Sequence, residues 1–127
     1  MLVAGGDQEE PIADEVRGLL DGHVVLDRRL AERGHFPAVD VLASVSRVMG
    51  AVVEPGHAAA AARVRALLAA WERQRDLVLL GAYRAGSDPE VDLAIERWPA
   101  IEAFLRQRGD EREPLGRTVE RLAELAA

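Results

Sequence analysis

A long helical pattern in the second half of the chain is the feature that most restricts its fold. Glu54-Pro55-Gly56 opens this pattern, and apolar residues then recur at helical spacing over residues 57–82. The face that they form consists of Ala60, Val64, Leu67, Leu68, Trp71 and Val78. Because a helix with one apolar stripe buries it against other elements, the pattern predicts a helical bundle.

A second helix is expected to start at residues 86–90. Ser87 and Glu90 have the spacing of a capping box, and Pro89 suits the first helical turn. Pro99 is expected to end or kink this helix. The apolar face beyond it continues with Ile101, Phe104 and Leu105.

A third helix begins at Glu113-Pro114. Its apolar side is predicted to contain Leu115, Val119, Leu122 and Ala126. Residues 51–127 are therefore expected to form a C-terminal helical domain.

Residues 1–50 have a different character, because short strand and helix signals alternate there. The strand signals fall on residues 2–4 and 23–26, and the helix signals on residues 11–20 and 28–33. Asp27 is a plausible N-cap, and Gly34 is the expected end of the helix that follows it. This order predicts the edge of an α/β domain with parallel strands. The fold class is thus mainly α, with two short strands at the edge of an α/β domain and then the helical bundle.

Composition excludes several functions. The 127 residues have a net charge of −6, which argues against sequence-independent nucleic-acid binding. All sixteen basic residues are arginine and cysteine is absent, so lysine chemistry, disulfides and thiolate metal sites are excluded. No apolar run approaches the ~18 residues of a membrane span, and no signal peptide is recognisable. The three histidines are spaced too widely for a zinc site, and Ser44 and Ser46 lack a placed base for a hydrolase triad.

Two adjacent runs resemble a known family. Residues 10–26 read EPIADEVRGLLDGHVVL, and residues 34–49 read GHFPAVDVLASVSRVM. Both are similar to the hexameric ATPase that energises type III protein secretion and flagellar export, a relative of the catalytic subunits of rotary ATP synthases. The resemblance is specific over residues 10–49 and stays collinear through residues 82–107. It implies that residues 1–50 are the trailing part of a RecA-like nucleotide-binding domain.

The resemblance assigns three residues to ATP chemistry. Arg47, in the Ser-x-Ser-Arg-Val motif, matches an arginine finger that reaches the γ-phosphate held by a neighbouring subunit. Phe36 matches the aromatic residue that stacks on adenine, and Phe104 resembles a second aromatic residue near the base. The ordinary alternatives are a surface or capping role for Arg47 and core packing for both phenylalanines.

The resemblance also implies a partner surface. Residues 81–92 correspond to the loop that faces a coiled-coil stalk protein in this family, and export chaperones with their cargo bind partly at the same end. The candidate contacts are Tyr83, Arg84, Asp88 and Glu90. An ordinary solvated turn with a helix cap is the alternative.

Taken together, these features predict the C-terminal part of a type III secretion or flagellar export ATPase. The chain has no G-x-x-x-x-G-K-[ST] loop, so ATP and Mg²⁺ would be held with the help of a P-loop portion or a neighbouring subunit. The expected setting is a homohexamer, cytoplasmic and peripheral at the inner-membrane export apparatus. The sequence leaves open the flagellar or injectisome system, the cargo, the oligomeric state, and whether the chain is a cut piece or a truncated gene product. A standalone module that binds a stalk or chaperone without ATP chemistry is the competing hypothesis.

Overall fold

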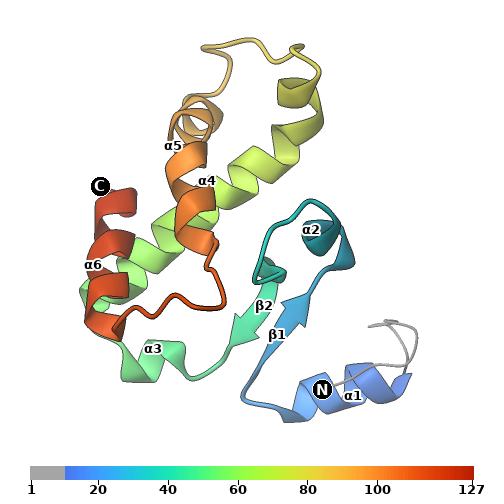
Figure 1. Cartoon of the computed structure of the whole chain (residues 1–127), viewed down its shortest axis with the longest axis vertical. Coiled ribbons are helices and arrows are strands. Elements are labelled where there is room, and N and C mark those ends of the chain that lie inside the picture. The colour runs from blue at the N-terminus through green and yellow to red at the C-terminus, as the bar shows by residue number, and fades with distance from the viewer. Residues whose placement is uncertain (1–10) are drawn as a thin grey trace.

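The computed structural model describes residues 11–127, so the strand expected at residues 2–4 lies outside the described residues. The described elements are α1 (Pro11–Leu19), β1 (Gly22–Leu26), α2 (Arg28–Glu32), β2 (Val39–Ser46), α3 (Met49–Val52), α4 (Pro55–Leu79), α5 (Pro89–Leu105) and α6 (Leu115–Ala126). Three long helices pack together at one end, and the two strands with the short helices lie at the other (Figure 1). The predicted fold class is confirmed.

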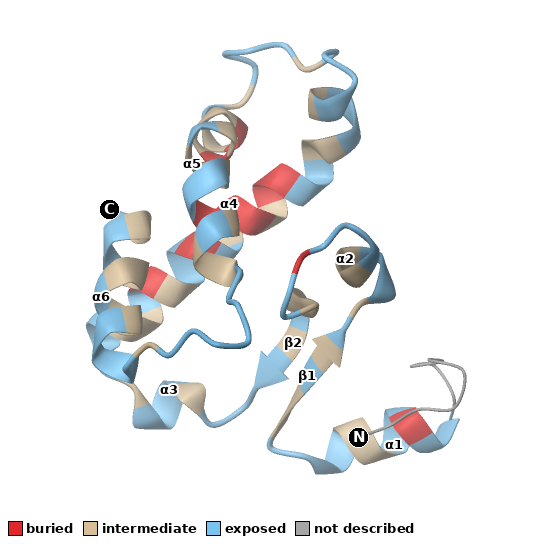
Figure 2. Cartoon of the chain, viewed as in Figure 1, coloured by how far each residue is buried: buried red, intermediate tan, exposed pale blue. Residues whose placement is uncertain are grey.

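The hydrophobic core lies between α4, α5 and α6. Its buried members are Val64, Leu67, Ala70 and Trp71 from α4 and Val91, Ala94 and Ile101 from α5, and Figure 2 shows buried residues concentrated on these two helices. Trp71 stacks on Trp98 of α5, with ring centroids 4.5 Å apart and an interplanar angle of 13°. Leu122, Leu125 and Ala126 of α6 pack against the same cluster. The apolar face expected on α4 is confirmed, because most of its predicted members are buried.

The helix boundaries partly differ from the prediction. α4 begins at Pro55 and is followed by Gly81, whose φ of 70° is favourable for glycine. Asp88, rather than Ser87, caps α5, because its carboxylate accepts hydrogen bonds from the backbone N–H groups of Glu90 and Val91 at 2.9 and 3.3 Å. The Ser87 hydroxyl donates instead to the Arg84 carbonyl at 2.6 Å.

Pro99 does not end α5, which continues to Leu105. A helix-interior proline removes one backbone donor. The packing of Trp98 and Ile101, on either side of Pro99, against the core outweighs this loss.

The sheet differs from the prediction. β1 pairs with β2, a strand that the sequence pattern did not predict, and this pair is antiparallel. The parallel arrangement expected for the strands at residues 2–4 and 23–26 stays a prediction, because residues 2–4 lie outside the described residues. The register shifts between His23 and Val25, whose partners are Val45 and Asp40. The Ser44 hydroxyl accepts a hydrogen bond from the Val25 N–H at 2.9 Å. At this shift in register, a side-chain oxygen thus takes the place of the backbone carbonyl that regular strand pairing would provide.

Few polar contacts join the strands to the helical core. The Arg65 guanidinium on α4 donates to the backbone carbonyls of Val41 and Leu42, at 2.5 and 3.2 Å. The Gln107 N–H, just after α5, donates to the Phe36 carbonyl at 2.9 Å. These contacts fix the loop after α2 beside the end of α5.

The short helix α2 forms as the sequence predicts. The Asp27 carboxylate accepts a hydrogen bond from the Arg29 N–H at 2.8 Å, and hydrogen bonding to the Arg29 side chain holds the pKa of Asp27 below its usual value. Gly34 follows the helix with a φ of 72°, and the next N–H, that of His35, donates back to the Leu30 carbonyl at 2.9 Å.

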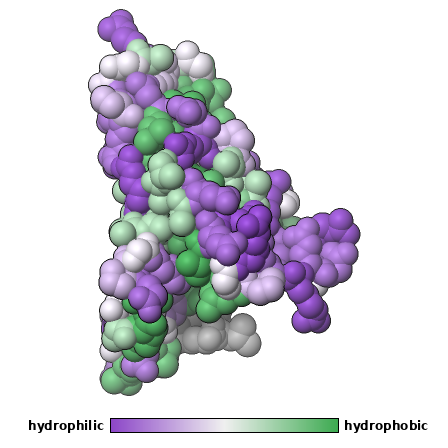
Figure 3. Space-filling model, turned by 90° about the vertical axis from the view of Figure 1, so that its left-hand side faces the viewer, coloured by the Kyte–Doolittle hydropathy of each residue, from purple (hydrophilic) through white to green (hydrophobic). Residues whose placement is uncertain are grey.

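Several predicted apolar positions are exposed. Ile12 and Leu19 of α1 are 70% and 80% exposed. Leu115, the first residue of α6, is 75% exposed, so the predicted apolar side of this helix is not buried at its start. Figure 3 shows hydrophobic residues interspersed among hydrophilic ones on one face of the molecule. No helix within residues 11–127 combines the length and the apolar character that a membrane crossing needs.

The core position of Ile101 gives a stability prediction. Ile101 is fully buried, so Ile101→Ala should lower the free energy of unfolding by about 2–5 kcal/mol through lost burial and a residual cavity. Urea unfolding followed by circular dichroism and tryptophan fluorescence measures the change. Leu80→Ala, at a position 80% exposed, is the control and should change it by less than about 0.5 kcal/mol. Equal destabilisation by the two substitutions would contradict the assigned core.

Candidate functional site

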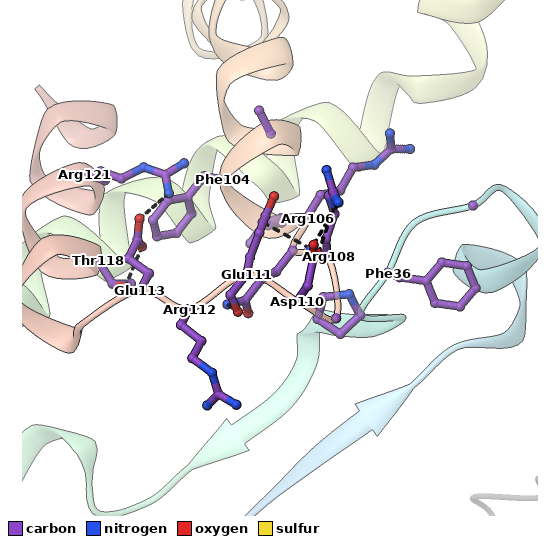
Figure 4. A pocket seen from close by; sticks show the side chains of 16 residues that line it. Phe36, Phe104, Arg106, Arg108, Asp110, Glu111, Arg112, Glu113, Thr118 and Arg121 are labelled. Carbon is purple, nitrogen blue, oxygen red and sulfur yellow. Dashed lines mark hydrogen bonds and ion pairs between the residues drawn. The ribbon is translucent and has the colours of Figure 1, made fainter.

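Phe36 and Phe104, which the sequence analysis assigned to base stacking, line the same hollow. The hollow has a volume of about 1100 Å³ and is bounded by the loop after α2, the segment 103–113 and two residues of α6. In Figure 4, Phe36 lies on one side and Phe104 on the other, with the segment 106–113 between them. Residues far apart in the sequence thus come together at one opening.

Core packing does not describe either phenylalanine. Phe36 is 56% exposed, and its backbone is held by the hydrogen bond from Gln107 to its carbonyl. Phe104 is only half-buried and lies outside the hydrophobic core cluster. An exposed aromatic face beside a hollow is chemically suited to stacking against a planar ligand.

The polar wall of the hollow is held by local hydrogen bonds. The Glu111 carboxylate accepts from the Arg108 N–H at 3.1 Å, and the Glu111 carbonyl accepts from the Gln107 side-chain amide at 3.1 Å. Arg108 also pairs with Asp110 at 2.9 Å. The segment therefore presents both charge signs to the opening.

A compact cluster lies beside Phe104, and its three members, Glu113, Thr118 and Arg121, also line the hollow. The Glu113 carboxylate accepts one hydrogen bond from the Thr118 hydroxyl and one from the Arg121 guanidinium, both at 2.7 Å. The Arg121 guanidinium carbon lies 5.3 Å from the centroid of the Phe104 ring, within cation–π range. The Thr118 hydrogen bond, followed by that of Arg121, holds the pKa of Glu113 below its usual value. Sequence reasoning missed this cluster, because a charged helix side usually indicates only a solvated surface.

Arg47 lies elsewhere, directly after β2. Its N–H donates to the Asp21 carbonyl at 2.8 Å. Its guanidinium donates to the carbonyl of Leu20 and, at 3.2 and 3.5 Å, to those of Arg17 and Gly18 at the end of α1. Arg47 is exposed and is not among the residues that line the hollow. In this chain it therefore makes the helix-capping contacts that were the ordinary alternative for it.

The loop between α4 and α5 uses three of its four predicted contact residues internally. The Tyr83 hydroxyl donates to Asp92 at 2.8 Å, Asp88 caps α5, and Glu90 pairs with Arg63 at 3.4 Å. Arg84 is the exposed member of the four. Three leucines at the end of α4, which the sequence pattern did not single out, are also exposed: Leu77, Leu79 and Leu80, at 45%, 65% and 80%.

No metal centre is apparent in the part of the chain that the structure describes, where no group of three or more His, Asp or Glu side chains could hold an ion. His35 is buried beside the hollow at 8% exposure, and burial, together with the nearby charge of Arg106, lowers its pKa. His35 therefore favours the neutral form, as expected for a buried imidazole.

Family comparisons agree with this architecture. The family model for the T3SS EscN ATPase C-terminal domain matches residues 53–124, and the nucleotide-binding domain of the ATP synthase alpha/beta family matches residues 1–46. The chain belongs to the type III secretion and flagellar export ATPase family.

Relatives of both systems are similar to this chain. It is 54% identical over 127 residues to a flagellum-specific ATP synthase of Pseudomonas aeruginosa, and 49% identical over 127 residues to a type 3 secretion system ATPase of Pseudomonas syringae pv. syringae. In each case the match covers 100% of this chain and 28% of the relative. The chain thus spans somewhat more than a quarter of the length of these relatives.

Solved structures of the family have the same fold. The assembled ATPase EscN from enteropathogenic E. coli matches with a TM-score of 0.90 and 42% identity, covering 95% of this chain and 29% of that one. EscN in complex with its central stalk EscO matches with a TM-score of 0.86 and 43% identity, covering 93% and 29%. The boundary between the two family matches, at residues 46–53, agrees with the predicted division near residue 50, which remains a prediction.

The Glu113 cluster gives a pH prediction. Because the folded-state pKa of Glu113 lies below 4.5, its pairing contributes stability above about pH 4.5 that is lost as pH falls through the lower folded-state value. Thr118→Val removes the largest cause of the lowered pKa and should raise the Glu113 titration midpoint in a carbon-detected NMR titration. Thr118→Ser keeps the hydroxyl and should leave it unchanged. An unmoved midpoint in Thr118→Val would contradict the assigned hydrogen bond.

Proposed function

We propose that this chain is the C-terminal part of an ATPase that energises type III protein export, in an injectisome or a flagellum. The observation that supports this most is the meeting of Phe36 and Phe104 at one hollow, from separate segments of a chain that belongs to this family. Two aromatic faces beside an opening of about 1100 Å³ suit the purine base of ATP. The chain would then supply part of the adenine pocket.

The residues of this chain are suited to binding the base of ATP and not to binding its phosphates. The sequence has no phosphate-binding glycine-rich loop and no lysine, so the triphosphate and Mg²⁺ would be held by a P-loop portion or a neighbouring subunit. Bound ATP would supply the phosphoanhydride bond whose hydrolysis to ADP and phosphate drives export. This chain would bind and orient its base.

Arg47 is proposed to act in trans on the triphosphate of a neighbouring subunit in a homohexamer. Its guanidinium is exposed on the surface, so a second subunit can approach it. An arginine guanidinium is planar and always positively charged, so it stabilises the negative charge that develops on the phosphoryl oxygens in the transition state. The contacts to the end of α1 would have to open for the side chain to extend.

The loop between α4 and α5 is proposed to face a coiled-coil stalk protein, and in part export chaperones with their cargo. The exposed Arg84 and the exposed leucines nearby favour such a surface over a merely solvated turn. EscN, a structural relative, has been solved in complex with its central stalk EscO. Tyr83, Asp88 and Glu90 would then shape the loop through their internal contacts. The proposed location is cytoplasmic, peripheral at the inner-membrane export apparatus.

A standalone interaction module without ATP chemistry is the second candidate. The internally bonded loop and the exposed leucines favour it, since they provide a binding surface that does not depend on nucleotide. It predicts that partner binding is indifferent to substitution of Arg47.

Complementation with a P-loop-bearing portion of such an ATPase tests the proposal. The reconstituted wild type should hydrolyse ATP, and Arg47→Ala should lower kcat by about 10³–10⁵-fold with little change in nucleotide affinity. Phe36→Ala should instead raise KM about tenfold or more, because a stacking face is lost, whereas Phe36→Tyr should stay near wild type.

Arg65→Ala is the matched control for Arg47. It also removes a guanidinium that donates to backbone carbonyls, but away from any proposed phosphate contact, so kcat should change by less than about tenfold. A complex that forms and shows no activity dependent on Arg47 would favour the interaction module.

A further inference from the structure

The cluster of Glu113, Thr118 and Arg121 lies beside Phe104 and is arranged so that it holds the phenylalanine ring in place. The ring of Phe104 has two faces, and the Arg121 guanidinium lies over the ring at 5.3 Å from its centroid. Figure 4 shows Arg121 and Glu113 beside Phe104, with α6 at the left of the view. A ligand that stacks on Phe104 therefore has to use the face that Arg121 leaves open.

Arg121 is itself held in place. Its guanidinium donates to Glu113 at 2.7 Å, and Thr118, one helical turn earlier on α6, donates to the other oxygen of the same carboxylate at 2.7 Å. The side chains of Arg121 and Glu113 are 36% and 27% exposed, so the pair is partly shielded from solvent. Both oxygens of the carboxylate are thus used, and the guanidinium has a fixed partner.

This arrangement changes what Phe104 can do. A half-buried phenylalanine outside the core is free to change rotamer. When a ligand stacks on it, the ring loses this freedom, and the lost conformational entropy lowers the binding affinity. A guanidinium held over one face favours a single ring position and withdraws electron density from the ring. Both effects favour stacking of an electron-rich purine on the opposite face.

We infer that Arg121, anchored by Glu113, is a positioning residue that sets the affinity of the ATPase for the nucleotide base by holding Phe104 in its stacking position. This inference rests on the proposed base pocket. It assigns a nucleotide-binding role to α6, a helix that also packs against the core through Leu122, Leu125 and Ala126.

A double-mutant cycle in the reconstituted ATPase tests the inference, with the Kd of a non-hydrolysable ATP analogue and the KM and kcat for ATP as readouts. Arg121→Leu should weaken analogue binding about threefold to fivefold and raise KM similarly, with kcat changed less than about twofold. In a Phe104→Leu background the same substitution should have no further effect, because the ring through which it acts is gone.

Arg117→Leu is the matched control, since Arg117 lies on the same helix and loses a comparable ion pair, to Glu120 at 3.1 Å, away from the hollow. It should leave binding unchanged. Glu113→Gln should reproduce part of the Arg121→Leu effect, because the anchor loses its charge.

The outcomes separate the inference from the proposed function. If Phe104→Leu weakens binding and Arg121→Leu does not, the base pocket stands and the inference is overturned. If Arg121→Leu weakens binding equally in both backgrounds, Arg121 acts by another route and the inference is again overturned. If neither Phe36→Ala nor Phe104→Leu weakens binding, the proposed base pocket itself fails, and the inference with it.

Discussion

The stacked pair of Trp71 and Trp98 is the contact on which the rest of the molecule depends. Their rings lie 4.5 Å apart and join α4 to α5, with Trp71 in the hydrophobic core and Trp98 packed against it. This contact fixes where α5 ends, and therefore where Phe104 and the segment after it emerge. Because Gln107 then binds the Phe36 carbonyl, the position of the loop after α2 follows from the helical core as well. The hollow between the two phenylalanines is a consequence of this packing.

Arginine side chains make the long-range polar connections outside the core. Arg65 binds carbonyls of β2, Arg47 binds carbonyls at the end of α1, and Arg97 binds the Leu125 carbonyl at 3.0 Å. A guanidinium can satisfy several carbonyls at once with its fixed fork of donors, which a lysine ammonium does less well. Arg121 differs from these three, because its partners are a carboxylate and an aromatic ring at the hollow.

Local signals predicted the helices well and the sheet poorly. The helix stop at Gly34 and the start at Pro55 depend on backbone preferences of single residues, so the sequence alone contains them. β2 was missed although Val39, Val41, Ala43 and Val45 alternate with polar residues over most of its length, and only Leu42 breaks the pattern. Its irregular pairing with β1, in which Asp40 and Ser44 take part, is a tertiary feature that no local signal contains. In the candidate site, the family resemblance located the phenylalanines. Arg121 could not be found in this way, since its role depends on tertiary proximity to Phe104.

Photolabelling with an azidoadenine nucleotide shows directly whether the hollow receives the nucleotide base. The ATPase reconstituted from this chain and a P-loop-bearing portion would be irradiated with the probe, and the labelled peptides mapped by mass spectrometry. If the hollow receives the base, the label should be found within residues 34–37 and 103–113, and excess ATP should prevent this labelling. Labelling confined to other peptides, or labelling of these peptides that excess ATP does not reduce, would contradict binding of the base in the hollow.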